Sequence, residues 1–199
     1  MTEAVVLDFD GTLYRDRDSA YEAFQEAVLD LLRDMGRENP ERIFREARRA
    51  VRNRRYTTTQ MFLEAKDIPR HRFAETVYPA VCEVAAQTDR SRIIDAFQDE
   101  GYRVDVLTNN SERLVELYLD RQGREAASII GASSLPVPKP QEEAFTFFIR
   151  QAPYSPEAAV YVDDEEENTA VAASMGMDAH HIEADAAAET LTGVIGCTL

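Results

Sequence analysis

Short apolar runs alternate with helix-forming segments along much of the chain, and this alternation constrains the fold more than any other feature. Runs typical of buried strands lie at 4–7, 102–107, 128–130 and 158–162, followed by a less regular one at 179–182. Between the later runs, apolar residues recur at helical spacing. Strands joined by helices in this way form parallel sheets with right-handed crossovers. The order therefore predicts an α/β fold, a Rossmann-like doubly wound parallel sheet with helices on both faces.

One long helical stretch interrupts this alternation. Between the first strand and the others, residues 14–88 contain only helix-forming patterns, such as the apolar spacing over 24–35. Pro79 should kink or divide the last of these helices, because proline has no N–H to donate. We therefore expect a catalytic core made of 1–13 and 89–199, with 14–88 inserted as an α-helical cap domain above the strand ends.

The chain carries a large excess of acidic side chains. Its 37 Asp and Glu against 22 Lys and Arg give a formal net charge of −15. Nucleic acids and anionic membranes bind basic surfaces, so we expect neither as a partner. Only two of the basic residues are lysines, Lys66 and Lys139. This composition resembles that of halophilic proteins from salt-loving archaea, although a GC-rich genome with an ordinary acidic surface would give a similar pattern.

Other bulk features favour a cytoplasmic protein. The two cysteines, Cys82 and Cys197, are too few for a disulfide framework. No apolar run approaches the roughly 18–20 residues of a membrane helix, and no basic segment precedes an apolar one at the N-terminus. We expect a monomer or a small homo-oligomer.

Chemically reactive residues follow four of the predicted strands. In doubly wound sheets, ligands bind beyond the carboxyl ends of the strands. The residues placed there by the sequence are Asp8 and Asp10, Thr108, Lys139, and Asp163 with Asp164. Each of these positions alone is weak evidence for a site, but four in succession are strong evidence.

The same residues carry a resemblance to a known family. Asp8-Phe9-Asp10-Gly11-Thr12-Leu13 resembles motif I of the haloacid dehalogenase-like (HAD) hydrolase superfamily. Leu107-Thr108-Asn109 resembles motif II, Pro138-Lys139-Pro140 motif III, and Val162-Asp163-Asp164 with Asn168 motif IV. Members with a helical cap carry it just after motif I, as here. The resemblance implies a Rossmann-like core, bound Mg²⁺ and hydrolysis of phosphate esters through an aspartyl-phosphate.

The acidic residues suit that chemistry. A carboxylate can attack phosphorus, which makes Asp8 the expected nucleophile. Asp10 would protonate the leaving group and then take a proton from water. Carboxylates gathered in one place repel one another, by roughly 4 kcal/mol for a pair 4 Å apart at an effective dielectric of 20. Mg²⁺ would remove this cost, held by Asp8, the main-chain carbonyl of Asp10, and motif IV, with Asp164 favoured over Asp163.

The remaining motif residues would bind the phosphate group. The Thr108 hydroxyl would donate to a phosphoryl oxygen, helped by N–H groups at the start of the next helix. Lys139 would place a positive charge between Asp8 and the phosphate. Gly11 allows a tight turn there, and we add its neighbour Thr12 and Asn109 to the phosphate-binding set. Asn168 stands where many relatives carry an acid, so its part in the metal shell stays open.

Plainer interpretations exist for several residues. Thr108 could cap a helix, Lys139 could be a solvated loop residue, and 165–167 could be an ordinary acidic first turn. A basic run in the cap could attract an anionic substrate or form a solvated helix face: Arg48, Arg49, Arg52, Arg54 and Arg55. A polar segment beside it could line a substrate pocket: Tyr56, Thr57, Thr58 and Gln60.

These features predict a phosphatase acting on a small phosphorylated metabolite. A phosphotransferase such as a sugar-phosphate mutase is the alternative within the same fold. A dehalogenase fits less well, because that branch lacks the second acid that Asp10 supplies. A phosphoryl-accepting signalling domain has a different motif order, and a catalytically silent binding module would be expected to lack one of the charged motif residues.

Overall fold

Five parallel strands form a single sheet in the part of the chain that the structure describes, with the order β3-β2-β1-β4-β5. The structure is a computed structural model, and it describes residues 2–53, 58–183 and 193. The strands are β1 (Ala4–Leu7), β2 (Arg103–Leu107), β3 (Ser128–Ile130), β4 (Ala159–Asp163) and β5 (Asp178–His181). The predicted doubly wound parallel sheet is confirmed.

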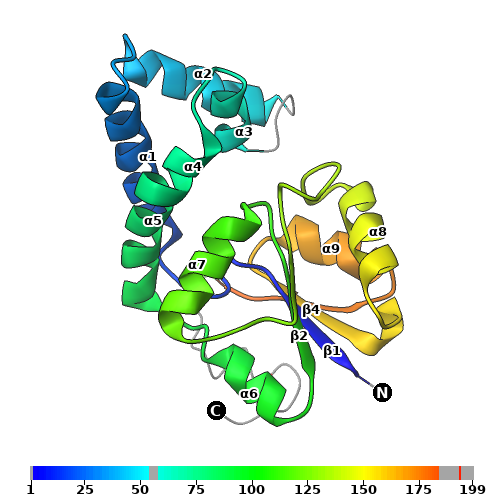
Figure 1. Cartoon of the computed structure of the whole chain (residues 1–199). Helices are drawn as coiled ribbons and strands as arrows, with labels where there is room; N and C mark the ends of the chain where they lie inside the picture. The colour runs from blue at the N-terminus through cyan, green and yellow to red at the C-terminus, as the bar shows by residue number, and fades with distance from the viewer. Residues whose placement is uncertain (1, 54–57, 184–192, 194–199) are drawn as a thin grey trace. The chain divides into compact units, whose positions relative to one another are not determined.

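Helices cover both faces of this sheet (Figure 1). They are α6 (Ile93–Asp99), α7 (Glu112–Gln122), α8 (Glu142–Gln151) and α9 (Glu166–Ser174), with a 3₁₀ turn at Pro156–Ala158. On the face covered by α8 and α9, Phe145 packs edge-on against Tyr161 with ring centroids 5.5 Å apart. α6 and α7 cover the opposite face. None of the helices that the structure describes is long and apolar enough to cross a membrane.

The chain forms two compact units, one comprising residues 1–17 and 88–199 and the other 18–87. The first unit contains the sheet, and the second consists of helices. Residues 14–17 group with the sheet because Tyr14 forms backbone bridges with both Asp10 and Asp89.

The helical unit has an apolar interior built from several short elements. After α1 (Arg17–Asp34) come α2 (Pro40–Arg52), α3 (Thr59–Glu64), α4 (Arg70–Arg72), a π-helical turn (Phe73–Val77), α5 (Tyr78–Ala85) and a 3₁₀ turn (Ala86–Thr88). The break expected at Pro79 is confirmed, since the π-helical turn ends just before α5 and Pro79 lies in the first turn of α5. A wider turn accommodates a residue that cannot donate the usual helical hydrogen bond.

A charged anchor holds the loop after β3 against the start of α7. The Glu112 carboxylate accepts hydrogen bonds from the N–H groups of Gly131 (3.1 Å), Ser133 (3.2 Å) and Ser134 (3.0 Å). Partial burial would raise the pKa of Glu112, but these donors and its own N–H outweigh it and hold the pKa below its usual value. The carboxylate form of Glu112 therefore stabilises the folded state.

We expect Glu112→Gln to lower the free energy of unfolding by about 1–2 kcal/mol at pH 7. Because the pKa is lower in the folded state, this contribution is present above the unfolded-state pKa and is lost as pH falls through the folded-state pKa. Urea denaturation between pH 7 and pH 3.5 should show the difference from wild type shrinking as pH falls. Glu116→Gln, at an exposed position of the same helix, is the control, and a pH-independent penalty would contradict the assignment.

Candidate functional site

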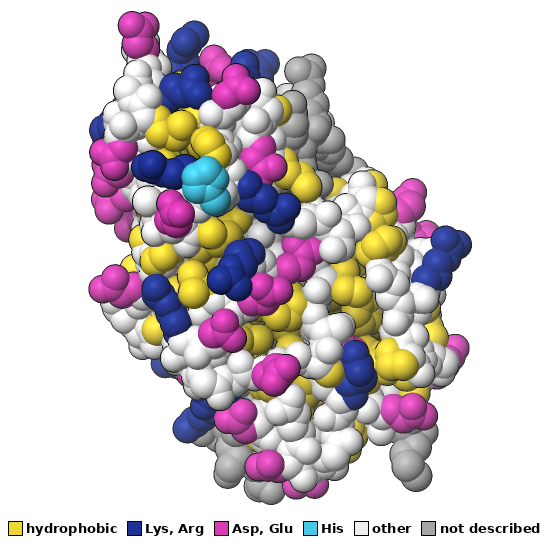
Figure 2. Space-filling model, viewed as in Figure 1, with side chains coloured by type: hydrophobic (Ala, Val, Ile, Leu, Met, Phe, Trp, Pro, Cys, Tyr) yellow, Lys and Arg dark blue, Asp and Glu magenta, His cyan; other side chains and the backbone are white. Residues whose placement is uncertain are grey.

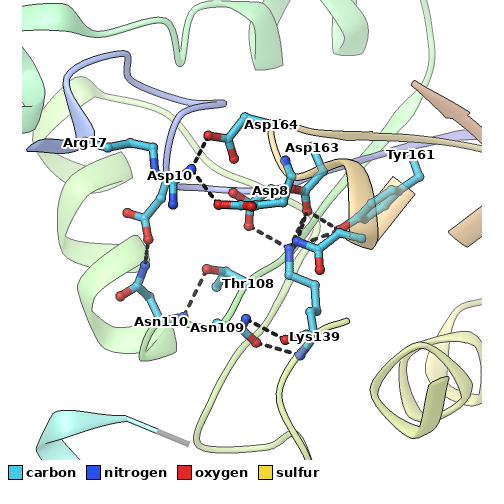
Figure 3. Close-up of polar contacts among 12 residues, drawn as sticks. Asp8, Asp10, Arg17, Thr108, Asn109, Asn110, Lys139, Tyr161, Asp163 and Asp164 are labelled. Carbon is cyan, nitrogen blue, oxygen red and sulfur yellow. Dashed lines mark hydrogen bonds and ion pairs between the residues drawn. The ribbon is translucent and has the colours of Figure 1, made fainter. Parts of the chain in front are cut away.

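Three carboxylates converge where β1 and β4 end. Asp8 directly follows β1, Asp163 is the last residue of β4 and Asp164 is the next. The strands lie in register, with Leu7 paired to Val162, so their ends meet at one edge of the sheet. One carboxylate oxygen from each of the three aspartates lies within 4.8 Å of the other two. The sequence-predicted cluster of Asp8, Asp163 and Asp164 is therefore assembled in the fold (Figure 3).

Lys139 places its ammonium group inside this cluster. Its Nζ donates to Asp8 Oδ1 (2.7 Å), Asp163 Oδ2 (2.7 Å) and the Tyr161 hydroxyl (3.0 Å). An ammonium group has three N–H donors, so these contacts use all of them. The lysine side chain is only 1% exposed, which rules out the solvated-loop interpretation.

Burial and charge set the protonation of this cluster. Burial raises the pKa of Asp8 well above its usual value, and the attraction of Lys139 offsets only part of this. Burial alone would lower the pKa of Lys139, but Asp8 and Asp163 outweigh it and raise that pKa. For Asp163, burial would raise the pKa, yet Lys139 and other donors hold it below its usual value. Lys139 and Asp163 thus form a charged pair. Lys139 compensates only part of the cost of burying the Asp8 carboxylate, so a further positive charge would stabilise its ionised form.

Asp163 and Asp164 differ in the number of hydrogen bonds that their carboxylate oxygens already accept. Asp163 Oδ2 accepts from Lys139, Tyr161 (2.5 Å) and Asn168 (2.9 Å), and its Oδ1 accepts from the Glu165 N–H (2.8 Å). Asp164 Oδ2 forms an ion pair with Arg17, whereas Asp164 Oδ1 is buried and has no hydrogen-bond partner in the described structure. Burial raises the pKa of Asp164, and Arg17 offsets part of this rise. A buried carboxylate oxygen without a donor, next to two further carboxylates, fits an oxygen-liganded divalent cation.

Asp10 lies beside the three-carboxylate cluster and its side chain has partners of its own. Tyr14 donates its hydroxyl to Asp10 Oδ1, and Asn110 Nδ2 donates to Oδ2 at 2.5 Å. Burial raises the pKa of Tyr14 well above its usual value, and the Asp10 charge adds to this, so the tyrosine keeps the proton it donates. The two contacts fix the orientation of the Asp10 carboxylate.

The motif II residues support Lys139 as well as lining the site. The Asn109 amide binds the main chain of Lys139 twice, accepting from its N–H (2.8 Å) and donating to its carbonyl (3.1 Å). The Asn109 side chain is thus engaged with the loop instead of facing the carboxylates. The buried Thr108 hydroxyl accepts from the Asn110 N–H at 3.1 Å, which leaves its own proton available. The Thr12 hydroxyl is buried, with no hydrogen-bond partner among the described residues.

Several residues in the site have no counterpart in the sequence prediction. The hydroxyl of Tyr161 stands among the apolar residues that precede Asp163 in β4, and it is the one visible signal of a polar role. Tyr14 and Asn110 lie in the segments after β1 and β2, and Arg17 is the first residue of α1, so no strand or helix pattern in the sequence marks them. Their roles depend on contacts with distant residues.

Other residues singled out from the sequence lie elsewhere. Thr58 caps α3 through the Met61 N–H (3.2 Å), and Gln60 is buried and accepts from the Tyr78 hydroxyl, so both serve the helical unit. His181 lies on β5, where its Nε2 is 3.1 Å from the Asp164 carbonyl oxygen. Five further residues lie outside the described part of the chain: Arg54, Arg55, Tyr56, Thr57 and Cys197.

Gly11 has a backbone conformation that the site requires. Its φ is +76°, and a Cβ placed there would lie 2.1 Å from Asp164 Oδ2 and 2.9 Å from Arg17 Cδ. We expect Gly11→Ala to lower the free energy of unfolding by about 1–2 kcal/mol from backbone strain alone, and by more because the carboxylate must move.

The matched control is Gly36→Ala, because Gly36 also has a positive φ (+66°) and a Cβ there would meet no atom within 4 Å. Urea denaturation of both variants separates backbone strain from the steric clash with Asp164. Equal losses of unfolding free energy in the two variants would show that the steric clash with Asp164 does not contribute to the effect of Gly11→Ala.

Comparison with known proteins supports the same family. The family model for haloacid dehalogenase-like hydrolases matches residues 2–176. Phosphoglycolate phosphatase 1 of Pseudomonas aeruginosa is 31% identical over 103 residues, which cover 51% of this chain and 35% of that protein. The match thus spans about a third of the relative's length.

Two solved structures share the fold over nearly the whole chain. A HAD phosphatase from Thermococcus onnurineus aligns with a TM-score of 0.66 and 22% identity, covering 98% of each chain. A HAD family enzyme from Bacteroides thetaiotaomicron, in complex with magnesium and inorganic phosphate, aligns with a TM-score of 0.60 and 15% identity, covering 96% of this chain and 99% of that one. With the family match covering most of the sequence, the chain belongs to the haloacid dehalogenase-like hydrolases.

Proposed function

We propose that this hydrolase is a Mg²⁺-dependent phosphatase that cleaves small phosphate monoesters through an aspartyl-phosphate on Asp8. The observation that carries the proposal is the meeting of three carboxylates at the edge of the sheet where ligands bind, with a buried ammonium group paired to two of them. The magnesium and phosphate held by the Bacteroides enzyme of the same fold support it.

Asp8 and Asp164 are the side chains best suited to hold Mg²⁺. Asp164 has a buried oxygen without a donor, and Asp8 has a raised pKa that a cation would reverse. The oxygens of Asp163 already accept four hydrogen bonds, so we place it outside the first ligands. The main-chain carbonyl of Asp10 stays a candidate ligand. When bound, the ion would withdraw charge from the phosphoryl oxygens and offset the anionic substrate.

In the first step, an Asp8 carboxylate oxygen attacks phosphorus while the bond from phosphorus to the ester oxygen breaks. Asp10, oriented by Tyr14 and Asn110, gives its proton to the departing alkoxide. Lys139 stays bonded to Asp163 and can shift a donor from Asp8 to the phosphoryl group. The Thr108 hydroxyl has a free proton for another phosphoryl oxygen.

In the second step, Asp10 takes a proton from water as the water oxygen attacks phosphorus of the acyl phosphate. The bond from phosphorus to Asp8 breaks, which releases inorganic phosphate and restores the carboxylate. A mutase would return the phosphoryl group to a sugar hydroxyl at this step instead.

The proposal predicts release of inorganic phosphate from p-nitrophenyl phosphate or from members of a panel of phosphorylated metabolites, at low or at multimolar KCl. We expect turnover to vanish with EDTA and to return when Mg²⁺ is added in excess. Water labelled with ¹⁸O should place one labelled oxygen in the released phosphate. Turnover that persists in EDTA would contradict the metal dependence, and phosphoryl transfer to sugars without labelled phosphate would favour the mutase.

A further inference from the structure

Arg17 contacts the carboxylate cluster from the opposite side to Lys139 (Figure 3). Its Nη1 lies 2.5 Å from Asp164 Oδ2 and 2.8 Å from Glu165 Oε1. The Arg17 side chain is 41% exposed, whereas that of Asp164 is only 2% exposed. The pair therefore differs from an ordinary surface salt bridge, because one of its charges is buried.

The two cations divide the three carboxylates between them. Lys139 pairs with Asp8 and Asp163, and it lies within ion-pair distance of no other carboxylate described. Arg17 is the cation that pairs with Asp164, and its charge opposes the burial that raises the pKa of that carboxyl group. Without Arg17, Asp164 would be a buried charge with no cation at ion-pair distance among the described residues.

The packing around Arg17 is specific. The missing Cβ of Gly11 leaves the space in which the Arg17 side chain and the Asp164 carboxylate meet. Arg17 donates a hydrogen bond to Asp164 Oδ2, whereas the other carboxylate oxygen, Oδ1, is buried and has no hydrogen-bond partner among the described residues. The guanidinium group thus neutralises Asp164 without using the oxygen that a metal ion would need.

We propose that Arg17 is a placeholder cation, which compensates Asp164 when the site lacks metal and weakens the binding of Mg²⁺ when the metal arrives. This inference rests on the proposed metal site. A guanidinium beside Asp164 repels a divalent ion bound to the same carboxylate, so the two cations compete for one negative charge. By linkage, the Mg²⁺ affinity that Arg17 removes equals the difference between its contributions to the stability of the metal-free and of the metal-bound protein.

The competition explains how a buried acidic cluster can exist in both states. Bound Mg²⁺ compensates the carboxylates strongly, but a protein without metal would have to bury Asp164 unpaired. Arg17 reduces the cost of burying the Asp164 charge in the metal-free protein, and so brings its stability nearer to that of the metal-bound protein. Because its side chain is partly exposed, it can withdraw towards solvent and towards Glu165, which is 53% exposed, when Mg²⁺ takes over the charge of Asp164.

The test compares Arg17→Gln with wild type by calorimetric titration of the metal-free protein with Mg²⁺, and by urea denaturation with and without Mg²⁺. We expect the variant to bind Mg²⁺ about tenfold more tightly. It should unfold at lower urea concentration than wild type without metal, and this deficit should shrink in saturating Mg²⁺. Arg17→Lys keeps the charge and should bind Mg²⁺ nearly as wild type does. Arg15→Gln, at an exposed position two residues away, should change neither quantity.

Each other result overturns the inference in a distinct way. If Arg17→Gln binds Mg²⁺ with unchanged affinity, with or without a loss of stability, then Arg17 and Asp164 form an ordinary ion pair that does not compete with the metal. Weaker binding would mean that Arg17 orients Asp164 as a ligand and does not compete with the metal. If wild type binds no Mg²⁺ at all, the proposed metal site fails and the placeholder role fails with it, whereas the first two results leave the metal site intact.

Discussion

Replacing Asp8 by asparagine should abolish phosphatase turnover, lowering kcat by at least about 10³-fold. The change removes the oxygen that we propose attacks phosphorus, and it leaves a side chain of nearly the same shape. Because Asp8 is buried and its carboxylate is costly in the metal-free protein, the variant should fold at least as well as wild type without Mg²⁺. Turnover of p-nitrophenyl phosphate in excess Mg²⁺, together with urea denaturation, measures both effects.

Asp30→Asn is the matched control, since it makes the same chemical change at a residue of the helical unit whose side chain is 71% exposed. It should retain wild-type turnover. Rapid acid quenching with ³²P-labelled substrate should trap a labelled wild-type protein and leave Asp8→Asn unlabelled. An Asp8→Asn variant with more than a few per cent of wild-type kcat, after contaminating phosphatases have been excluded, would show that another group attacks phosphorus.

Replacing Lys139 by methionine should damage both stability and turnover. The change leaves Asp8 and Asp163 facing each other in a buried site without their shared cation. Breaking a buried ion pair by removing one partner typically costs about 3–5 kcal/mol. Urea denaturation in the metal-free state should show a loss of this size, and kcat should fall by roughly 10²-fold or more, because the phosphoryl group loses a positive charge.

The chain supplies its own control, because Lys66 is its other lysine and is exposed in the helical unit. Lys66→Met should keep wild-type stability and turnover. Adding Asp163→Asn to Lys139→Met removes the stranded negative charge and should restore part of the stability but none of the turnover. A Lys139→Met protein as stable as wild type would show that the ammonium group does not hold the cluster together.

The site could be predicted from the sequence where a residue's role follows from its place at a strand end. Asp8, Asp163 and Asp164 each follow or end a buried parallel strand, and strands in register bring their ends together whatever the details of packing. The same reasoning located Thr108. It also predicts Lys139, in the loop after the third strand. The structure adds that the Asn109 side chain binds both the N–H and the carbonyl of Lys139.

Residues whose roles depend on long-range contacts could not be predicted. Arg17 meets Asp164 across 147 positions of sequence, and Tyr161 meets the ammonium group of a residue 22 positions away. In the fold, the π-helical turn before Pro79 is a local consequence of a missing N–H, which is why an interruption there was predictable. By contrast, Asn168 is buried on α9 because it donates to Asp163, a contact that helical periodicity does not encode.

The account depends above all on a cation shared by two carboxylates at the ends of β1 and β4, and a crystal structure grown in saturating Mg²⁺ tests it most directly. We predict one ion bound by carboxylate oxygens of both Asp8 and Asp164, at about 2.0–2.1 Å from each. Density without an ion at that position, or Asp8 and Asp164 turned towards separate protein partners, would contradict the central claim.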